Sequence, residues 1–366
     1  MKIMGVVGAR PNFMKISPIV EEMKKHPWFK FTLLHTGQHY DTDMSDTFFR
    51  DLDLPNPDIF LNVGSGSHAE QTAKVMLKFE AALKKNKPDL LIVVGDVNST
   101  IACSLVAVKM GVKIAHVEAG LRSFDRGMPE EINRIITDAI SDLLFTTCKD
   151  ANRNLQKEGI PKDKIHFVGN VMIDTMLRLK SRAHKTGYFE KFLNLEKGGF
   201  SLLTLHRPRN VDVKENLTDI LLALYEVQER IRIVWPLHPR TESMLKRHDV
   251  FGKLKGMKNM KVTRPLSYLQ FLNLMMHSKF VMTDSGGIQE ETTVLKIPCL
   301  TLRDNTERPV TISQGTNVLV KSNASELVKE VDKILSGNVK KGRIPRNWDG
   351  KASTRIVKVL SSFDSR

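Results

Sequence analysis

Short runs of apolar residues alternate along the chain with longer segments in which apolar residues recur every three or four positions. The short runs are typical of strands that are covered by helices on both faces. The longer segments are typical of amphipathic helices. Residues 12–25, for example, place Ile16, Ile19, Val20 and Met23 on one face. This alternation predicts βαβ units with parallel sheets.

The first half of the chain predicts one doubly wound parallel sheet. Its expected strands are residues 2–7, 31–35, 89–94, 113–117, 143–147 and 164–168. From about residue 181 to residue 199 the pattern is lost and the sequence becomes polar, ending in Lys197-Gly198-Gly199, a typical breaker. We therefore place a domain boundary in this stretch.

A second series of strands and helices follows the boundary. Its expected strands are residues 200–205, 231–235, 261–264, 280–283, 298–302 and 317–320, and its expected helices include residues 215–230 and 268–277. The predicted fold class is α/β, with two Rossmann-like doubly wound domains that face a cleft. The expected domains are residues 1–180, which carry most acid and base residues, and residues 198–348, while residues 349–366 form a helix that packs back on the N-terminal domain.

Length and composition agree with two domains in a reducing compartment. A chain of 366 residues exceeds the size at which one hydrophobic core keeps growing. The longest aliphatic run, residues 90–94, is far shorter than the roughly 20 residues that cross a membrane. The apolar N-terminus lacks a signal-peptide cleavage site, and Cys103, Cys148 and Cys299 are odd in number and widely spaced. A cytoplasmic protein without a disulfide framework is expected.

The formal net charge of +15 is compatible with nucleic-acid binding, with an anionic substrate or with a lysine-rich surface. The lysine pairs, such as Lys24-Lys25 and Lys84-Lys85, are scattered and have no aromatic residues between them. This pattern disfavours a nucleic-acid partner. It favours a small anionic ligand, which a positive field would attract.

Carboxylates follow two predicted strands of the first half. Asp96 comes directly after Val94-Gly95, and Glu118 lies at the end of the strand that includes His116. Ligands of open α/β sheets bind beyond the carboxyl ends of the strands. Capping of the next helix would explain Asp96 alone, and the helix dipole would explain Glu130 or Glu131. Three carboxylates at one edge are more than capping requires and predict a proton donor or acceptor.

The second half contains a candidate phosphate site. Ser285-Gly286-Gly287 follows a predicted strand and opens a helix, so that backbone N–H groups and the positive end of the helix dipole are available to an anion. The acids Glu290 and Glu291, farther along the same helix, could reach a ribose diol. His206 and His238 each directly follow a strand and are expected to point into the cleft.

Common metal and dinucleotide motifs are missing from the sequence. It contains no H-E-x-x-H, no paired C-x-x-C and no EF-hand spacing, so that no metal site is predicted. Gly64-Ser65-Gly66 does not open the first βα turn, as a nicotinamide-binding fingerprint would require. No cofactor is expected.

Several motifs in the same order resemble the non-hydrolysing UDP-N-acetylglucosamine 2-epimerases over nearly the whole chain. The resemblance implies a glycosyltransferase-B type fold, a homodimer, and interconversion of UDP-N-acetylglucosamine and UDP-N-acetylmannosamine without metal or nicotinamide, in the biosynthesis of cell-surface polysaccharides. The matching motifs are Gly8-Ala9-Arg10-Pro11, Thr36-Gly37-Gln38-His39, Gly95-Asp96, residues 116–122, residues 129–134, residues 283–291 and residues 303–309.

The resemblance also implies roles for individual residues. One departure concerns Asp41, which replaces a glutamine that bacterial relatives carry in a loop binding a regulatory substrate molecule, so substrate activation does not carry over. The implied catalytic residues are Asp96, Glu118, Glu131 and His206, and the implied UDP-binding residues are Arg10, His238, Ser285, Gly286, Gly287, Glu291 and Arg308, with Lys15, Gln38 and Phe271 as additions.

Other functions on the same fold remain open at this point. A hydrolysing epimerase would release free N-acetylmannosamine and UDP, but no sugar-kinase domain accompanies this sequence. An inverting glycosyltransferase is disfavoured by the acid-rich cleft. A catalytically silent UDP-sugar sensor would need only the Ser285–Gly287 end, so the acids Asp96, Glu118 and Glu131 argue for an enzyme.

Overall fold

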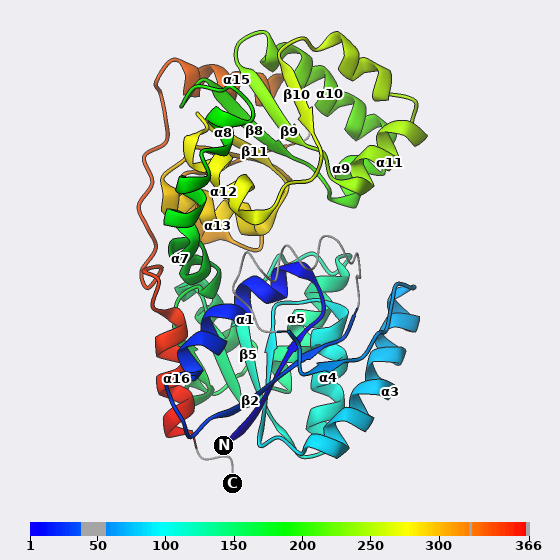
Figure 1. Cartoon of the computed structure of the whole chain (residues 1–366), viewed down its shortest axis with the longest axis vertical. Helices are drawn as coiled ribbons and strands as arrows, with labels where there is room; N and C mark the ends of the chain where they lie inside the picture. The colour runs from blue at the N-terminus through cyan, green and yellow to red at the C-terminus, as the bar shows by residue number, and fades with distance from the viewer. Residues whose placement is uncertain (38–55, 322–323, 364–366) are drawn as a thin grey trace. The chain divides into compact units, whose positions relative to one another are not determined.

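The structure is a computed structural model that describes residues 1–37, 56–321 and 324–363. The chain divides into two compact units (Figure 1). Unit 1 comprises Met1–Arg178 and Arg346–Arg366, and unit 2 comprises Leu179–Pro345. Both units contain a parallel sheet, so the predicted class of two α/β sheets is confirmed.

The described strands of unit 1 form a seven-stranded parallel sheet in the order β3-β2-β1-β4-β5-β6-β7. The strand order reverses between β1 and β4, where doubly wound sheets bind their ligands. The short β3 was not predicted, and β5 extends beyond the predicted residue 117. The strands are β1 (Lys2–Val7), β2 (Lys30–His35), β3 (Ile59–Phe60), β4 (Leu90–Val94), β5 (Lys113–Ala119), β6 (Leu143–Thr146) and β7 (Ile165–Phe167).

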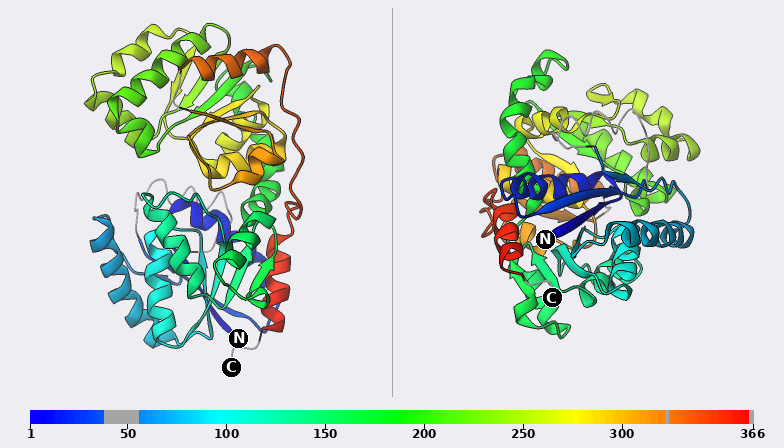
Figure 2. Two further views of the ribbon diagram at one scale, coloured as in Figure 1. Left: turned by 180° about the vertical axis from the view of Figure 1, so that it is seen from behind. Right: turned by 60° about the horizontal axis from the view of Figure 1, so that its bottom comes forward.

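Helices lie on both faces of the unit 1 sheet (Figure 1, Figure 2). On one face, Val75 and Phe79 of α3 pack in the core with Val6 of β1 and Val93 of β4. Burial on both faces explains why the strands read as continuous apolar runs. The helices are α1 (Arg10–Met23), α3 (His68–Asn86), α4 (Asn98–Lys109), α5 (Pro129–Ala139), α6 (Lys149–Lys157), η1 (Lys162–Lys164), α7 (Val171–Thr186) and α16 (Ala352–Ser362).

The C-terminal segment of the chain packs within unit 1. Trp348 is buried, and its indole Nε1 donates a hydrogen bond to the carbonyl of Thr147 at 2.9 Å. Asp174 of α7 accepts hydrogen bonds from the backbone N–H groups of Ala352 and Ser353. These are two of the first-turn N–H groups of α16 that have no partner within the helix. The polar sequence after residue 181 does not end α7, which continues to Thr186.

The described strands of unit 2 form a six-stranded parallel sheet in the order β10-β9-β8-β11-β12-β13. This order reverses between β8 and β11, as the unit 1 sheet does between β1 and β4. The ends of the predicted strands are within two residues of the observed ones. The strands are β8 (Phe200–Thr204), β9 (Arg232–Pro236), β10 (Met260–Thr263), β11 (Val281–Thr283), β12 (Cys299–Leu302) and β13 (Asn317–Val320).

The core of unit 2 contains residues of the strands and of α10 and α15, including Trp235, Leu224 and Val331.

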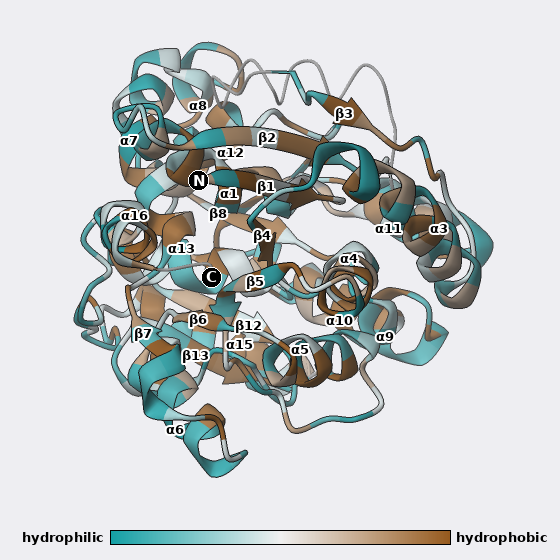
Figure 3. Ribbon diagram, turned by 90° about the horizontal axis from the view of Figure 1, so that it is seen from below, coloured by the Kyte–Doolittle hydropathy of each residue, from teal (hydrophilic) through white to brown (hydrophobic). Residues whose placement is uncertain are grey.

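Strands β4, β6 and β12 are mainly hydrophobic, whereas α6 is mainly hydrophilic (Figure 3). No helix in the described ranges is long and apolar enough to cross a membrane. The helices of unit 2 are α8 (Tyr188–Lys191), α9 (Pro208–Val211), α10 (Lys214–Gln228), α11 (Pro239–Arg247), η2 (Phe251–Gly256), α12 (Tyr268–His277), α13 (Gly286–Leu295), α14 (Pro309–Ser313) and α15 (Ala324–Leu335).

Candidate functional site

The carboxyl edge of the unit 1 sheet carries Asp96 and Glu118. Asp96 follows β4 after a turn at Gly95, whose φ is +70°. Glu118 lies at a register shift between Val117 and Ala119 and has a φ of +74°. The left-handed region costs an L-residue about 1–2 kcal/mol, and such strain is typical of functional sites. The bulge directs Glu118 differently from a regular strand residue.

Glu118 forms an ion pair with Lys15 of α1. Both side chains are nearly inaccessible to water, with exposed fractions of 4% and 8%. A Cβ at Gly95 would lie 2.7 Å from Lys15 Nζ and 3.4 Å from Glu118 Oε2. Gly95 therefore provides both the left-handed turn and the space for this pair. The structure thus brings two of the sequence-predicted site residues, Lys15 and Glu118, into direct contact.

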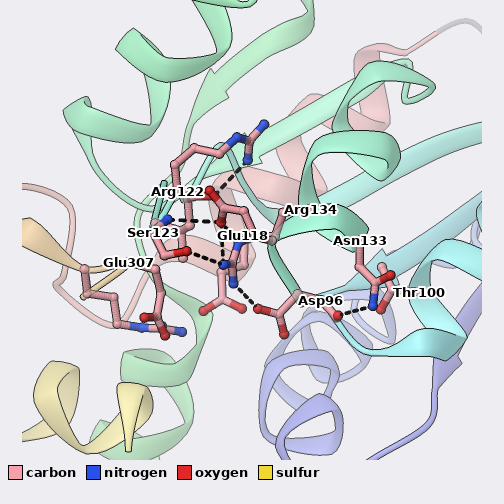
Figure 4. A network of polar contacts seen from close by, with 12 residues as sticks. Asp96, Thr100, Glu118, Arg122, Ser123, Asn133, Arg134 and Glu307 are labelled. Atoms are coloured by element: carbon pink, nitrogen blue, oxygen red, sulfur yellow. Dashed lines mark hydrogen bonds and ion pairs between the residues drawn. The ribbon is translucent and has the colours of Figure 1, made fainter. Parts of the chain in front are cut away.

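Arg134 of α5 forms ion pairs with both Asp96 and Glu131. Its Nη1 lies 2.5 Å from Asp96 Oδ2 and its Nη2 lies 2.5 Å from Glu131 Oε2. Asn133 donates a hydrogen bond to the Asp96 carbonyl at 2.9 Å. Figure 4 shows Asp96, Asn133 and Arg134 in this network. The spacing of Glu131 and Arg134, one turn apart on α5, places both on the same face of the helix.

Glu131 and Asp96 differ in what else surrounds them. Glu131 is buried and accepts backbone hydrogen bonds from Ser123 at 3.0 Å and Phe124 at 2.8 Å. Burial alone would raise the pKa of Glu131, but these bonds and Arg134 lower it below its ordinary value. The Asp96 side chain is 26% exposed. Glu131 is thus ionised and holds both Arg134 and the loop that contains Ser123 and Phe124. Asp96, in contrast, is accessible to a ligand.

Unit 2 places His206 beside a buried carboxylate that the sequence reasoning did not single out. Asp284 is inaccessible to water and lies 3.0 Å from His206 Nδ1. It also accepts hydrogen bonds from the backbone of Arg207 and the side chain of Asn210. Burial would raise the pKa of Asp284, but His206 and the backbone donors lower it. The signal was available, because Asp284 directly follows a strand, as Asp96 nearly does.

His206 and His238 lie together at the carboxyl edge of unit 2. The His206 side chain is 37% exposed, and its ring centroid lies 5.5 Å from that of His238. His238 is the N-cap of α11, where its side chain accepts a hydrogen bond from the Arg240 backbone at 3.2 Å. Asp284 contacts Nδ1 of His206, and Nε2 lies on the opposite side of the ring.

The Ser285-Gly286-Gly287 segment forms the start of α13, with Ser285 at the N-cap. The first-turn N–H groups of a helix have no intrahelical partners and favour anions. A Cβ at Gly286 would lie 2.5 Å from Arg308 Nη1 and 2.8 Å from Glu307 Oε1. Gly286 is therefore required for the close approach of Arg308 to the helix start, in addition to any contact with phosphate.

Glu307 lies among three arginines. Its carboxylate is 2.5 Å from Arg308 Nη1, 2.8 Å from Arg303 Nη1 and 3.5 Å from Arg207 Nη2. Burial acts to raise the pKa of Glu307, but the arginines outweigh it and hold the pKa far below its ordinary value. Arg308 also pairs with Glu290 of α13 at 2.9 Å. The sequence reasoning selected Arg308 but gave no separate role to Glu307 or Arg303, although both belong to the same quoted motif, and it did not single out Arg207.

Glu291 follows Glu290 on α13 and is buried beside Tyr268 of α12. The Tyr268 hydroxyl donates a hydrogen bond to Glu291 Oε1 at 2.6 Å. Burial raises the pKa of Glu291 to about 7, although the bond from Tyr268 lowers it. Phe271, on the same helix as Tyr268, is partly buried. Glu291 therefore changes its charge near neutral pH, unlike Glu131.

Arg10 begins α1, but its side chain lies outside the described part of the structure, as do Gln38 and Asp41. Gly287 is the second residue of α13. Within the described residues, no group of three or more His, Cys, Asp or Glu side chains is arranged to hold a metal ion.

Similarity to known proteins extends over nearly the whole chain. The family described as UDP-N-acetylglucosamine 2-epimerase matches residues 21–361. A UDP-N-acetylglucosamine 2-epimerase of Methanocaldococcus jannaschii is 45% identical and covers 99% of both chains. Its crystal structure in complex with UDP-GlcNAc and UDP has a TM-score of 0.93, covering 99% of this chain and 100% of that one. A UDP-2,3-diacetamido-2,3-dideoxy-D-glucuronate 2-epimerase of Pseudomonas aeruginosa is 39% identical, covering 99% of this chain and 100% of that one.

Proposed function

Because the chain belongs to the UDP-N-acetylglucosamine 2-epimerase family, we propose that it interconverts UDP-N-acetylglucosamine and UDP-N-acetylmannosamine without hydrolysing them. The observation that carries this proposal is the pair formed by Asp96 and Glu118. Asp96 follows β4, contacts Arg134 and is partly exposed, whereas Glu118 lies near the end of the neighbouring strand β5, contacts Lys15 and is buried. Epimerisation requires two groups that exchange a proton on opposite faces of one carbon.

Elimination of UDP explains why two carboxylates are sufficient for epimerisation at C2. The C2 proton of the sugar is not next to a carbonyl, so a carboxylate does not remove it directly. Departure of UDP creates an oxocarbenium-like centre that acidifies the C2–H bond. One carboxylate then takes the proton to give a 2-acetamidoglucal, and the other returns a proton to the opposite face before UDP adds again. Lys15 and Arg134 hold Glu118 and Asp96 in place.

Unit 2 supplies groups suited to the UDP portion. The diphosphate needs cations and oriented N–H donors as negative charge develops on it. The start of α13 and Arg308 provide both, and His206 has one ring nitrogen fixed by Asp284. Glu291 is suited to accept from the ribose hydroxyls. The relative of Methanocaldococcus jannaschii binds UDP-GlcNAc and UDP, which supports this assignment.

Incubation with UDP-N-acetylglucosamine in D2O, followed by proton NMR, tests the proposal. A protein acid exchanges its proton with solvent, so the UDP-N-acetylmannosamine formed should carry deuterium at C2. Product that retains the original hydrogen at C2 would contradict elimination and re-addition. Free N-acetylmannosamine with UDP would instead show the hydrolysing reaction. Glu130→Gln, which changes the partly exposed neighbour of Glu131, serves as a control with normal turnover.

The glucuronate-derived substrate of the Pseudomonas aeruginosa relative is the specific alternative, because that protein is 39% identical over nearly the whole chain. Its sugar carries a carboxylate that N-acetylglucosamine lacks. Parallel assays with the two UDP-sugars separate these candidates. Faster turnover of the acidic sugar would replace UDP-N-acetylglucosamine as the substrate while leaving the elimination chemistry unchanged.

We also propose that the protein is a cytoplasmic homodimer that supplies cell-surface polysaccharide synthesis. Family membership supports the dimer, and the three cysteines, all buried and unpaired, are compatible with a reducing compartment. Light scattering at micromolar concentration should give twice the 41.5 kDa mass of the chain. A monomer under these conditions would contradict the dimer without affecting the proposed reaction.

A further inference from the structure

His116 lies completely buried beneath the two strand ends that carry Asp96 and Glu118. It is part of β5, two residues before Glu118. Its Nε2 lies 2.9 Å from the carbonyl oxygen of Gly95, the residue before Asp96. Its Nδ1 lies 2.6 Å from Asp138 Oδ1 on α5. One imidazole therefore contacts both the β4 strand end and a buried carboxylate.

The partners of His116 determine its protonation. A carbonyl oxygen only accepts hydrogen bonds, so Nε2 must carry a proton to make the contact with Gly95. An ionised carboxylate also only accepts, so Nδ1 must carry a proton when Asp138 is charged. A bare ring nitrogen facing either oxygen at these distances would place two lone pairs against each other. If Asp138 is ionised, His116 is an imidazolium.

The surroundings of Asp138 keep it ionised. Its Oδ2 accepts a hydrogen bond from the Gly120 backbone at 3.0 Å and lies 2.8 Å from Arg122 Nη1. Burial would raise the pKa of Asp138, but His116 and Arg122 lower it below its ordinary value. Arg122 is in turn paired with Glu158, at 2.6 Å. Two cations and two anions thus balance within this group.

The backbone around this group has left-handed conformations where the carboxylates are held, at two glycines and at Glu118. Gly95, Glu118 and Gly120 all have φ between +70° and +78°. The Gly95 N–H donates to the Val117 carbonyl at 3.1 Å, while the Gly95 carbonyl accepts from His116. Asp138 binds Gly120 from the other side of Glu118. The charged group therefore fixes the chain two positions before Glu118, at His116, and two positions after it, at Gly120, as well as the residue before Asp96.

We propose that His116, as an imidazolium paired with Asp138, is a positioning residue that sets the separation of Asp96 and Glu118. This inference rests on the proposed proton exchange by those two carboxylates. It does not require His116 to touch the substrate, because the ring is completely buried. Misplacement of a reacting group by about 1 Å is enough to cost on the order of 10²-fold in rate.

The protonation state of His116 is tested on the unaltered protein. Proton–nitrogen NMR of protein with ¹⁵N-labelled histidine, near neutral pH, should show two ring N–H groups for His116, assigned by their loss in His116→Gln. Asp138→Asn keeps the shape of the side chain but removes its charge, so one of the two ring protons should be lost. A single ring N–H in the unaltered protein would overturn the proposal whether or not any variant folds.

The positioning role is tested by kinetics. Asp138→Asn should lower kcat for epimerisation by about 10–10²-fold with little change in the affinity for UDP, because the UDP-binding groups belong to unit 2. His248→Gln, which alters a partly buried histidine of unit 2, is the control and should retain kcat. Normal kcat for folded Asp138→Asn would overturn the positioning role. If the unaltered protein lacks epimerase activity, the proposed function fails, and the NMR spectrum still decides the charge of His116.

Discussion

Asp96 and Asp284 occupy nearly equivalent positions in the two units and have opposite environments. Each follows the strand that pairs with the first strand of its unit along the chain, β4 beside β1 and β11 beside β8. The Asp96 side chain is 26% exposed and pairs with Arg134. Asp284 is inaccessible and accepts hydrogen bonds from the backbone N–H groups of His206 and Arg207. The two sheets place an aspartate at a similar position, and its burial determines whether a ligand can reach it.

The same contrast extends to the glutamates of the two edges. Glu131 in unit 1 is held ionised by Arg134 and two backbone donors, whereas Glu291 in unit 2 contacts Tyr268 and has a raised pKa. In unit 1 the partly exposed Asp96 and the buried Glu118 are the reactive candidates, and the buried Glu131 holds Arg134 beside Asp96. In unit 2 the buried acids orient His206 and the arginines. We infer that one topology supports proton exchange at one edge and anion binding at the other.

Loss of the exposed carboxylate should have the largest effect. Asp96→Asn should reduce turnover by about 10²-fold or more, the usual contribution of general acid–base catalysis, with UDP affinity nearly unchanged. Glu118→Gln should behave in the same way. Steady-state kinetics and calorimetric titration of UDP check both expectations. Near-normal rates for both variants would remove the distinction drawn between the two edges.

Loss of the buried counterpart should affect stability. Asp284→Asn should lower the free energy of unfolding by about 2 kcal/mol, since hydrogen bonds to a charged group contribute about 1.5–3 kcal/mol. Because the pKa of Asp284 is lowered in the folded state, its contribution is present near neutral pH and is lost as the pH falls through the acidic range. Urea unfolding at neutral and acidic pH measures this. A variant as stable as the unaltered protein at neutral pH would contradict the assigned role.

Filling the space at the start of α13 should weaken UDP binding. In Gly286→Ala the new methyl group would meet Arg308 Nη1 at 2.5 Å and Glu307 Oε1 at 2.8 Å, so the arginine must move. Overpacking of this kind costs about 1–3 kcal/mol, and we expect UDP affinity to fall about tenfold. Gly252→Ala is the control, because a Cβ there meets no atom within 4 Å. Equal UDP affinities for the two variants would argue against a UDP site at α13.

The smallest effect concerns the pH dependence of UDP binding. If ribose binds the ionised form of Glu291, whose pKa is about 7, affinity should rise with pH by at most about tenfold per unit below pH 7 and level off above it. The UDP phosphate also ionises near pH 6, and Glu291→Gln retains only that contribution. Tyr268→Phe should move the midpoint to higher pH, because Tyr268 lowers the pKa of Glu291. Identical pH profiles for Glu291→Gln and the unaltered protein would contradict a role for this carboxylate.

The local pattern of the sequence determined the elements and their edges. Helix 268–277 and strand 317–320 were predicted to the residue, because periodicity and breakers are local properties. The strand ends were also predicted well enough to select Asp96, Glu118, His206 and Ser285. Family motifs added Arg308 and Glu291. These features depend on residues that are neighbours in the chain.

Only the tertiary structure decided which of these side chains are exposed and what pairs with them. Lys15 and Glu118 are 103 positions apart, and Asp96 and Arg134 are 38 positions apart, so no local pattern contains their pairing. The left-handed bulge at Glu118 and the contact of Gly286 with Arg308 likewise arise from packing between distant segments. Charge state follows from burial and partners. The sequence therefore located the acids, and the folded chain assigned them different chemistry.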